Sequence, residues 1–154
     1  KGTMVGYLLN NTASLHGTVS RGVCRVEDGR LLGIKETLKI RLEPDGTIAD
    51  EAEGVLPADA VVSMNFWGFA PSFFRELEMF FYDFLRYEAG DNIKAECMLP
   101  SLVGKLIGEG KLKVSVLQSA DRWFGMTYHE DRQAVAEELK RLHACGVYPE
   151  TLRL

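Results

Sequence analysis

The chain has 154 residues, of which 46% are hydrophobic and 26% are charged, and its formal net charge is -4. This composition is typical of one compact domain with a sizeable core, and it excludes a largely disordered chain. The acidic balance argues against a nucleic-acid partner, because such a surface needs a basic stripe. No apolar run approaches the ~20 residues of a membrane span, so we expect no membrane partner either.

The cysteines and the start of the chain give two further expectations. Cys24, Cys97 and Cys145 are odd in number, far apart and without a CxxC spacing. They therefore predict reduced thiols rather than a disulfide frame or a zinc site, which points to the cytoplasm. The chain also begins almost directly in a strand-like segment, so we expect a fragment of a larger protein.

The first half of the chain has the pattern of strands and hairpins. Residues 4–9 are apolar and predict a strand, and residues 10–17 form a loop rich in Asn, Ser, Thr and Gly. A first hairpin spans 21–36 and turns at Asp28 and Gly29, where both positions tolerate the positive φ of a type I′ turn. A second hairpin spans 38–49. Residues 60–69 are almost continuously apolar, which predicts a central strand covered on both faces.

The second half is mainly helical. After Pro71 a helix is predicted from the 3.6-residue period of its apolar positions, which we expect to face the core: Phe73, Phe74, Leu77, Phe80, Phe81, Phe84 and Leu85. A shorter helix at 99–107, a strand at 111–118 and a last helix from about Glu130, burying Val135, Leu139 and Leu142, complete the chain. This order predicts an α/β domain, a mixed sheet with flanking helices.

Few motifs in the chain point to catalysis. Neither G-x-x-x-x-G-K-[ST] nor G-x-G-x-x-G is present, and the serines and histidines lack the contexts of a nucleophile or a metal site, so we assign no catalytic residue. Glu36 and Lys39 would point to opposite faces of a strand, so a joint role needs a bulge between them. The alternative is that Glu36 and Lys39 are ordinary charged residues on the solvent-facing side of a strand, without a joint role. Trp67 and Trp123 each stand at a strand end, where the ring either lines a cleft or packs in the core.

The stretch DRWFGMTYHEDRQAV, residues 121–135, allows two interpretations. Its aromatic rings, His129 and its three acidic residues suggest a metal and substrate site. Thr127 and Glu130, however, have the S/T-x-x-E spacing of a capping box, which starts a helix. Both interpretations stay open on the sequence alone.

Three successive segments, VGYLLNNTASLHGTVSRGVCRVEDGRLLGIKETLKI, VVSMNFWGFAPSFFREL and WFGMTYHEDRQAV, resemble one family. It is the bacterial sugar-1-phosphate nucleotidyltransferases, the group of the glucose-1-phosphate uridylyl- and thymidylyltransferases. The resemblance covers essentially the whole chain. It implies the C-terminal portion of a glycosyltransferase-A-like, Rossmann-like fold, in which residues 1–154 form the sugar-phosphate-binding half and the nucleotide-binding half is absent.

The resemblance also implies a reaction and its substrates. In the parent enzyme a sugar-1-phosphate oxygen would attack the α-phosphorus of an NTP and release pyrophosphate, with Mg²⁺ as the cofactor. The alternative is a degenerate member of the same fold that binds a ligand or a partner without turnover. In either case we expect this chain alone to be inactive, and we expect self-association through an uncovered sheet edge or apolar face.

The family motifs give a set of substrate-binding candidates. Gly17 would place its backbone against the sugar, and Glu36 would accept hydrogen bonds from sugar hydroxyls. The family lysine that meets the phosphate falls at Thr37, so Lys39 replaces it only with a change of register. The full set of candidates is Gly17, Glu36, Lys39, Asn65, Trp67, Glu96 and Trp123.

The family's metal ligand is missing from this chain. The motif W-x-D-x-G is WFGMT here, so Gly125 occupies the position of the aspartate. Asp121 or Asp131 could substitute from nearby. Both are equally explained as exposed charges, and a carboxylate such as Asp131 is favoured at a helix N-terminus by the helix dipole.

Overall fold

The computed structural model describes the chain except residues 15–16, 53, 91, 126–128, 150 and 152–154. The predicted capping box at Thr127 lies outside the described residues. The elements in chain order are β1 (Gly2–Leu8), a 3₁₀ helix η1 (Leu9–Asn11), β2 (Val19–Glu27), β3 (Arg30–Leu42), β4 (Ile48–Asp50), β5 (Gly54–Leu56), β6 (Val61–Phe69), α1 (Phe73–Asp83), a π-helix η2 (Phe84–Ala89), α2 (Leu99–Gly108), β7 (Val114–Ser119) and α3 (Asp131–Ala144).

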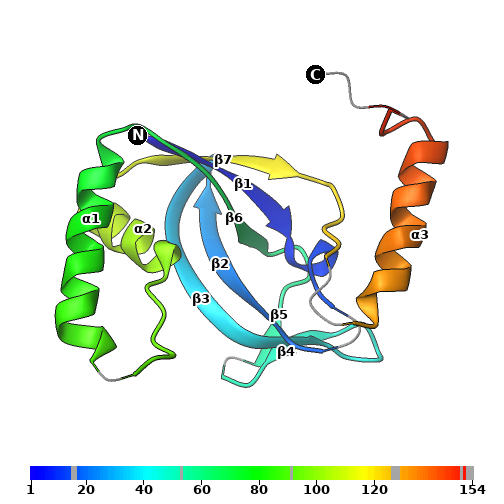
Figure 1. Ribbon diagram of the computed structural model, residues 1–154, viewed down its shortest axis with the longest axis horizontal. Coiled ribbons are helices and arrows are strands. Elements are labelled where there is room, and N and C mark those ends of the chain that lie inside the picture. Colours follow the sequence, from blue (N-terminus) through cyan, green and yellow to red (C-terminus); the bar gives the residue numbers. More distant parts are fainter. Residues whose placement is uncertain (15–16, 53, 91, 126–128, 150, 152–154) are drawn as a thin grey trace.

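Five of the strands close into a barrel. They pair in the order β2-β6-β1-β7-β3, and the additional pairing of β2 with β3 completes the ring, while β4 and β5 extend from β3 (Figure 1). β1 runs parallel to β7 and antiparallel to β6. The predicted fold is therefore wrong: the chain is not an open, Rossmann-like mixed sheet with flanking helices, and it does not have the architecture of the C-terminal portion of a nucleotidyltransferase domain.

Irregularities in the long strands explain the closure. The register of β2 with β3 shifts between Val19 and Arg21, and Lys39 on the β3 side has φ +55°. Such bulges bend a strand and increase its twist, and a barrel requires strands that bend. At the other end of β3, Arg30 lies opposite Ser115 of β7, and the Val116 N–H donates to the Gly29 carbonyl at 2.8 Å. This contact closes the ring.

Two hydrophobic clusters hold the elements together. The first joins strands to α1 and α2 and consists of Met4, Leu31, Phe73, Leu102, Val103, Leu106, Leu112 and Val114. The second lies toward β4 and β5 and consists of Leu9, Val19, Ile40, Ile48, Leu56 and Val62. α1 and α2 lie together at one side of the barrel, whereas α3 lies at the opposite side (Figure 1).

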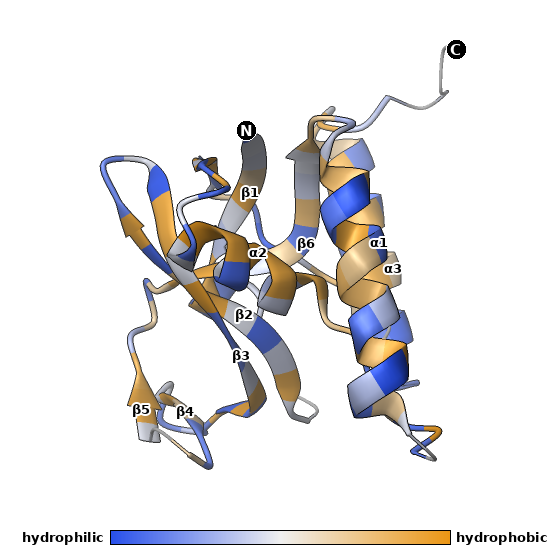
Figure 2. Ribbon diagram, turned by 90° about the vertical axis from the view of Figure 1, so that its left-hand side faces the viewer, coloured by the Kyte–Doolittle hydropathy of each residue, from blue (hydrophilic) through white to orange (hydrophobic). Residues whose placement is uncertain are grey.

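The helices and β6 are less covered than the sequence predicts. Phe73 and Phe84 are buried as expected, but Phe74, Phe81 and Leu85 of the same predicted core face are exposed. Hydrophobic and charged residues follow one another along α1 and α3 (Figure 2). α3 has no buried residue among those described, and Phe66 in β6 is 61% exposed. The barrel offers one side to α1, so only one face of that helix is covered.

Within the described part of the chain, no helix combines the length and the apolar character needed to cross a membrane.

Candidate functional site

A polar pocket opens where β2, β3 and β6 meet. Its volume is about 100 Å³, and its lining residues are Ser20, Arg21, Gly22, Glu36, Ser63, Met64 and Asn65. Gly22 is paired with Glu36 on one side and with Ser63 on the other. A Cβ at Gly22 would lie 2.8 Å from Ile34 Cδ1 and 3.4 Å from Ser63 Cβ. The glycine therefore leaves the space between the two polar neighbours open.

Asn65 enters this pocket through a bulge in β6. The register of β1 with β6 shifts at this point, since Met4 pairs with Trp67 but Gly6 pairs with Ser63. Asn65 has φ +58°, a left-handed conformation that Asn adopts more readily than most residues. Its backbone N–H donates to Ser63 Oγ at 3.1 Å, and its side-chain Oδ1 accepts from Trp67 Nε1 at 3.4 Å. The first bond holds the backbone of the bulge, and the second holds the side-chain amide.

Arg21 is a buried cation in the same wall. Its side chain is 9% exposed, Nη1 donates to the Ser20 carbonyl at 2.8 Å, and Nη2 donates to the Thr12 carbonyl at 2.5 Å. The buried Nε has no hydrogen-bond partner in the described part of the chain. Burial lowers the pKa of Arg21, and the nearby charge of Glu36 opposes that shift. The sequence analysis did not select Arg21. The available signal was a charged residue among the apolar positions of the predicted strand.

Glu36 lines this pocket, and the charge of Glu96 acts on it. Burial raises the pKa of Glu36, Arg21 opposes the shift, and the negative charge of Glu96 raises that pKa further. Glu96 does not line the pocket, but it is within electrostatic range of Glu36. Thr37, the next residue, is buried.

Lys39 and Gly17 do not line this pocket. The bulge that the sequence required between Glu36 and Lys39 is present, but Lys39 Nζ lies 2.7 Å from Glu51 Oε2, in an exposed ion pair. Gly17 precedes β2. Trp67 packs partly in the core, with its ring 5.6 Å from that of Phe69.

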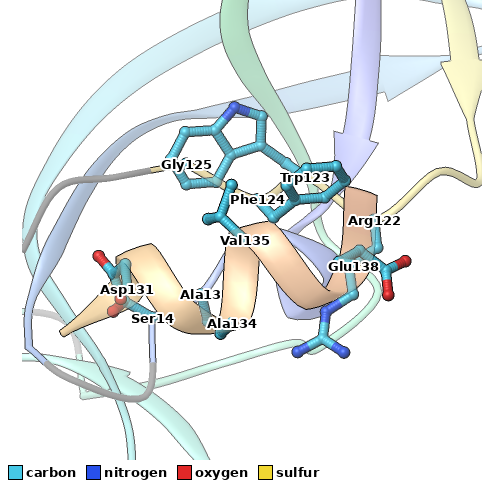
Figure 3. A pocket seen from close by; sticks show the side chains of 10 residues that line it. All are labelled: Ala13, Ser14, Arg122, Trp123, Phe124, Gly125, Asp131, Ala134, Val135 and Glu138. Atoms are coloured by element: carbon cyan, nitrogen blue, oxygen red, sulfur yellow. The ribbon is translucent and has the colours of Figure 1, made fainter. Parts of the chain in front are cut away.

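Trp123 connects the polar pocket to a second one. Its ring centroid lies 5.1 Å from the guanidinium carbon of Arg21, a cation–π contact, and the backbone N–H of Trp123 donates to the Asn11 carbonyl at 2.9 Å. The second pocket, of about 180 Å³, is lined by Ala13, Ser14, Arg122, Trp123, Phe124, Gly125, Asp131, Ala134, Val135 and Glu138 (Figure 3). Arg21 and Trp123 thus form a wall shared by both pockets.

The residues at the expected metal position do not fit a Mg²⁺ site. A Cβ at Gly125 would lie 2.5 Å from Trp123 Cζ2, so an aspartate there requires the ring to move. Asp131 lines the second pocket, whereas Asp121 accepts a hydrogen bond from Ser119 Oγ at 2.7 Å. In the part of the chain that the structure describes, no group of three or more His, Cys, Asp or Glu side chains is arranged to hold a metal ion.

Comparison with known proteins adds no family to this description. The sequence matches no protein-family model and no curated protein. The function is therefore argued from the pocket and from the motifs that the sequence carries.

Proposed function

We propose that this chain supplies the sugar-phosphate-binding pocket of a nucleotidyltransferase, which transfers a nucleotidyl group from an NTP to a sugar 1-phosphate and releases pyrophosphate. The observation that carries the proposal is the polar pocket of β2, β3 and β6, which Glu36 and Asn65 both line, with Glu96 in electrostatic range of Glu36. All three residues are also positions that the family motifs single out, which supports the proposal.

The groups at the pocket suit a ligand with several hydroxyls. The carboxylate of Glu36 accepts hydrogen bonds, the Asn65 amide both donates and accepts, and the Ser63 hydroxyl does the same. Hydrogen bonds to a charged group contribute about 1.5–3 kcal/mol each, more than those between neutral groups. Arg21 adds positive charge at the same wall for the phosphate of the ligand. No step of the proposal runs through Mg²⁺, which we assign to other parts of the parent enzyme.

In this division of roles the chain binds and orients one substrate. The sugar-phosphate oxygen attacks the α-phosphorus of the NTP, a P–O bond forms, and the bond to the pyrophosphate leaving group breaks. Holding the nucleophile in place is the contribution of this chain, because orientation lowers the entropy cost of the reaction. Stabilisation of charge on the transferring phosphorus is left to groups elsewhere.

Gly125 favours a second candidate function. Its position against the Trp123 ring replaces the carboxylate of the family motif. A module that binds a sugar or a sugar phosphate without turnover has no need of that carboxylate. The two candidates share the pocket and differ in the reaction.

The binding test uses the ¹⁵N-labelled chain, titrated with glucose 1-phosphate and observed by NMR, with glucose and inorganic phosphate as separate probes. We expect saturable binding in the millimolar range, with shifts at Gly22, Glu36 and Asn65. Glu36→Gln should weaken binding about tenfold, since a tenfold change corresponds to 1.4 kcal/mol and the hydrogen bonds lost are charged. Glu27→Gln, an exposed change at the hairpin turn, is the control.

Absence of saturation, or equal affinity of Glu36→Gln and the wild type, would refute the pocket assignment. A pyrophosphate-release assay with each NTP and glucose 1-phosphate then addresses catalysis. We expect no turnover above background by this chain alone. Turnover would show that it contains the nucleotide site and would overturn the division of roles.

A further inference from the structure

The polar pocket of β2, β3 and β6 holds two charges that no contact within the described part of the chain neutralises. Nη1 and Nη2 of Arg21 donate to backbone carbonyls and its buried Nε has no partner there, so no carboxylate bonds to the guanidinium. Among the same described residues, the Glu36 carboxylate accepts no hydrogen bond and forms no ion pair. Both side chains belong to one pocket wall.

The attraction between these two charges is smaller than the cost of burying them. Arg21 acts to lower the pKa of Glu36, and Glu36 acts to raise the pKa of Arg21. Burial outweighs this attraction at both residues, because the pKa of Glu36 is nevertheless raised and that of Arg21 lowered, each toward the neutral form. The charge of Glu96 adds to the shift at Glu36. A ligand that brings charges of its own can therefore offset part of this cost.

The two charges favour a ligand that carries a cation and an anion close together. A neutral sugar leaves both charges without an ionic partner, and a simple sugar phosphate offers an anion to Arg21 but only hydroxyls to Glu36. An ammonium group beside the phosphate gives each charge a partner of opposite sign, and hydrogen bonds between such groups are stronger than those between neutral groups. In a 2-amino-2-deoxy sugar 1-phosphate, the ammonium and the phosphate stand on adjacent carbons.

The pocket has room for this end of a ligand. Its volume of about 100 Å³ is several times the ~10–15 Å³ that one water requires, so a single ordered water does not fill it. Gly22 leaves the space between Glu36 and Ser63 open, as described above. The Ser63 hydroxyl and the Asn65 amide line the same space, and both donate and accept hydrogen bonds, which suits the remaining hydroxyls of a sugar.

We propose that the polar pocket binds an amino sugar 1-phosphate with a free, protonated amine at carbon 2, whose ammonium group donates to Glu36 and whose phosphate lies toward Arg21. This inference rests on the proposed function and narrows its substrate class. The negative charge of Glu96, which acts on Glu36, adds to the attraction for the ammonium. Acetylation of the amine removes its positive charge, so an N-acetylated sugar phosphate loses the advantage.

The test compares dissociation constants, measured by NMR titration, for glucosamine 1-phosphate, glucose 1-phosphate, N-acetylglucosamine 1-phosphate and serine. Glucosamine 1-phosphate should bind about tenfold more tightly than glucose 1-phosphate, because the two differ only in whether an ammonium or a hydroxyl meets Glu36. N-acetylglucosamine 1-phosphate should bind no more tightly than glucose 1-phosphate. Serine carries an ammonium and a carboxylate without a sugar, and it should bind more weakly than any of the three sugar phosphates.

Glu36→Gln assigns the preference to one carboxylate. The amide keeps the shape of the side chain but has no charge, so the preference for glucosamine 1-phosphate over glucose 1-phosphate should fall from about tenfold to less than about twofold. Glu27→Gln removes the same charge at an exposed position of the hairpin between β2 and β3, and it should keep the full preference. Circular dichroism checks that both variants are folded.

The outcomes separate this inference from the proposed function. Saturable binding of glucose 1-phosphate, with glucosamine 1-phosphate binding no more tightly, would overturn the inference and leave the proposed function standing. A preference that Glu36→Gln retains, or that N-acetylglucosamine 1-phosphate shares, would show that the charge of Glu36 does not recognise the amine and would overturn it too. Serine binding as tightly as glucosamine 1-phosphate would make the pocket an amino-acid site. Failure of every sugar phosphate to bind would refute the proposed function, and this inference with it.

Discussion

Replacing Arg21 by lysine tests the wall between the two pockets. Lysine keeps the positive charge but has neither the planar fork nor the stacking surface of the guanidinium. In the structure the guanidinium donates to the Ser20 and Thr12 carbonyls and lies over the Trp123 ring. An ammonium group reaches one of these partners at a time, so the substitution removes two of the three contacts.

The expected loss of stability follows from these contacts. One lost hydrogen bond from a charged donor costs about 2 kcal/mol. The weakened cation–π contact, in a largely desolvated place, costs about 1 kcal/mol. The buried Nε of Arg21 has no partner, and its removal recovers about 1 kcal/mol. We therefore expect Arg21→Lys to lower the free energy of unfolding by about 2 kcal/mol, which is about 4–8 °C in Tm for a chain of this size.

Urea unfolding followed by circular dichroism measures this change. The matched control is Arg86→Lys, since Arg86 also lies over an aromatic ring, that of Tyr87 at 5.3 Å, but is exposed. The control should stay within about 0.5 kcal/mol of the wild type. A double-mutant cycle of Arg21→Lys with Trp123→Leu should give a coupling of about 1 kcal/mol.

A stability of Arg21→Lys within about 0.5 kcal/mol of the wild type would refute the reasoning. It would mean that the geometry of the guanidinium contributes nothing and that its contact with Trp123 is incidental. A full loss without coupling to Trp123→Leu would instead assign the effect to the two carbonyl bonds alone.

Three further outcomes are expected from the polar pocket and its surroundings. Burial raises the pKa of Glu36, so the folded state disfavours its charge. Glu36→Gln should therefore be more stable than the wild type at pH 7, by a margin that grows as pH rises from about 4. Thermal unfolding at several pH values checks the sign, and a margin that shrinks as pH rises would contradict it. Gly22→Ala should destabilise the chain by about 1–2 kcal/mol in urea unfolding, since its Cβ would crowd Ile34; unchanged stability would show that Ile34 moves aside freely. Burial raises the pKa of the Cys24 thiol to about 12, so a thiol reagent at pH 8 should modify the exposed Cys145 quickly and Cys24 only after unfolding; equal rates would mean that β2 opens readily.

Local patterns predicted local structure well. The turn at Asp28 and Gly29 has φ +48° and +69°, as a type I′ turn requires, and the period after Pro71 gave α1 and its continuation. The closure of the barrel was not predictable in this way, because it depends on which distant strands pair. Leu38, beside the bulge at Lys39, is exposed, whereas Ile40, two residues on, is buried.

For the site, residue types were easier to select than their neighbours in space. Glu36, Asn65 and Glu96 were chosen from motifs; the first two line one pocket, and the charge of Glu96 acts on Glu36. Lys39 was chosen by the same reasoning, but the bulge turns it toward Glu51. Arg21 was missed because its role depends on Trp123, which comes from the far end of the chain. Contacts of that range leave no signal in a local pattern.

The parallel pairing of β1 with β7 has a consequence for how the chain folds. Gly2 lies opposite Val114 and Tyr7 opposite Ser119, so within the barrel β1 is synthesised well before its partner β7, and the ring cannot close until β7 is present. Contacts this distant in sequence slow folding, because the entropy of loop closure must be lost before the pairing is gained. The hairpin of β2 and β3, by contrast, can form as soon as it is synthesised. We expect pulse-labelling by hydrogen exchange to protect this hairpin early and β1 late, together with β7.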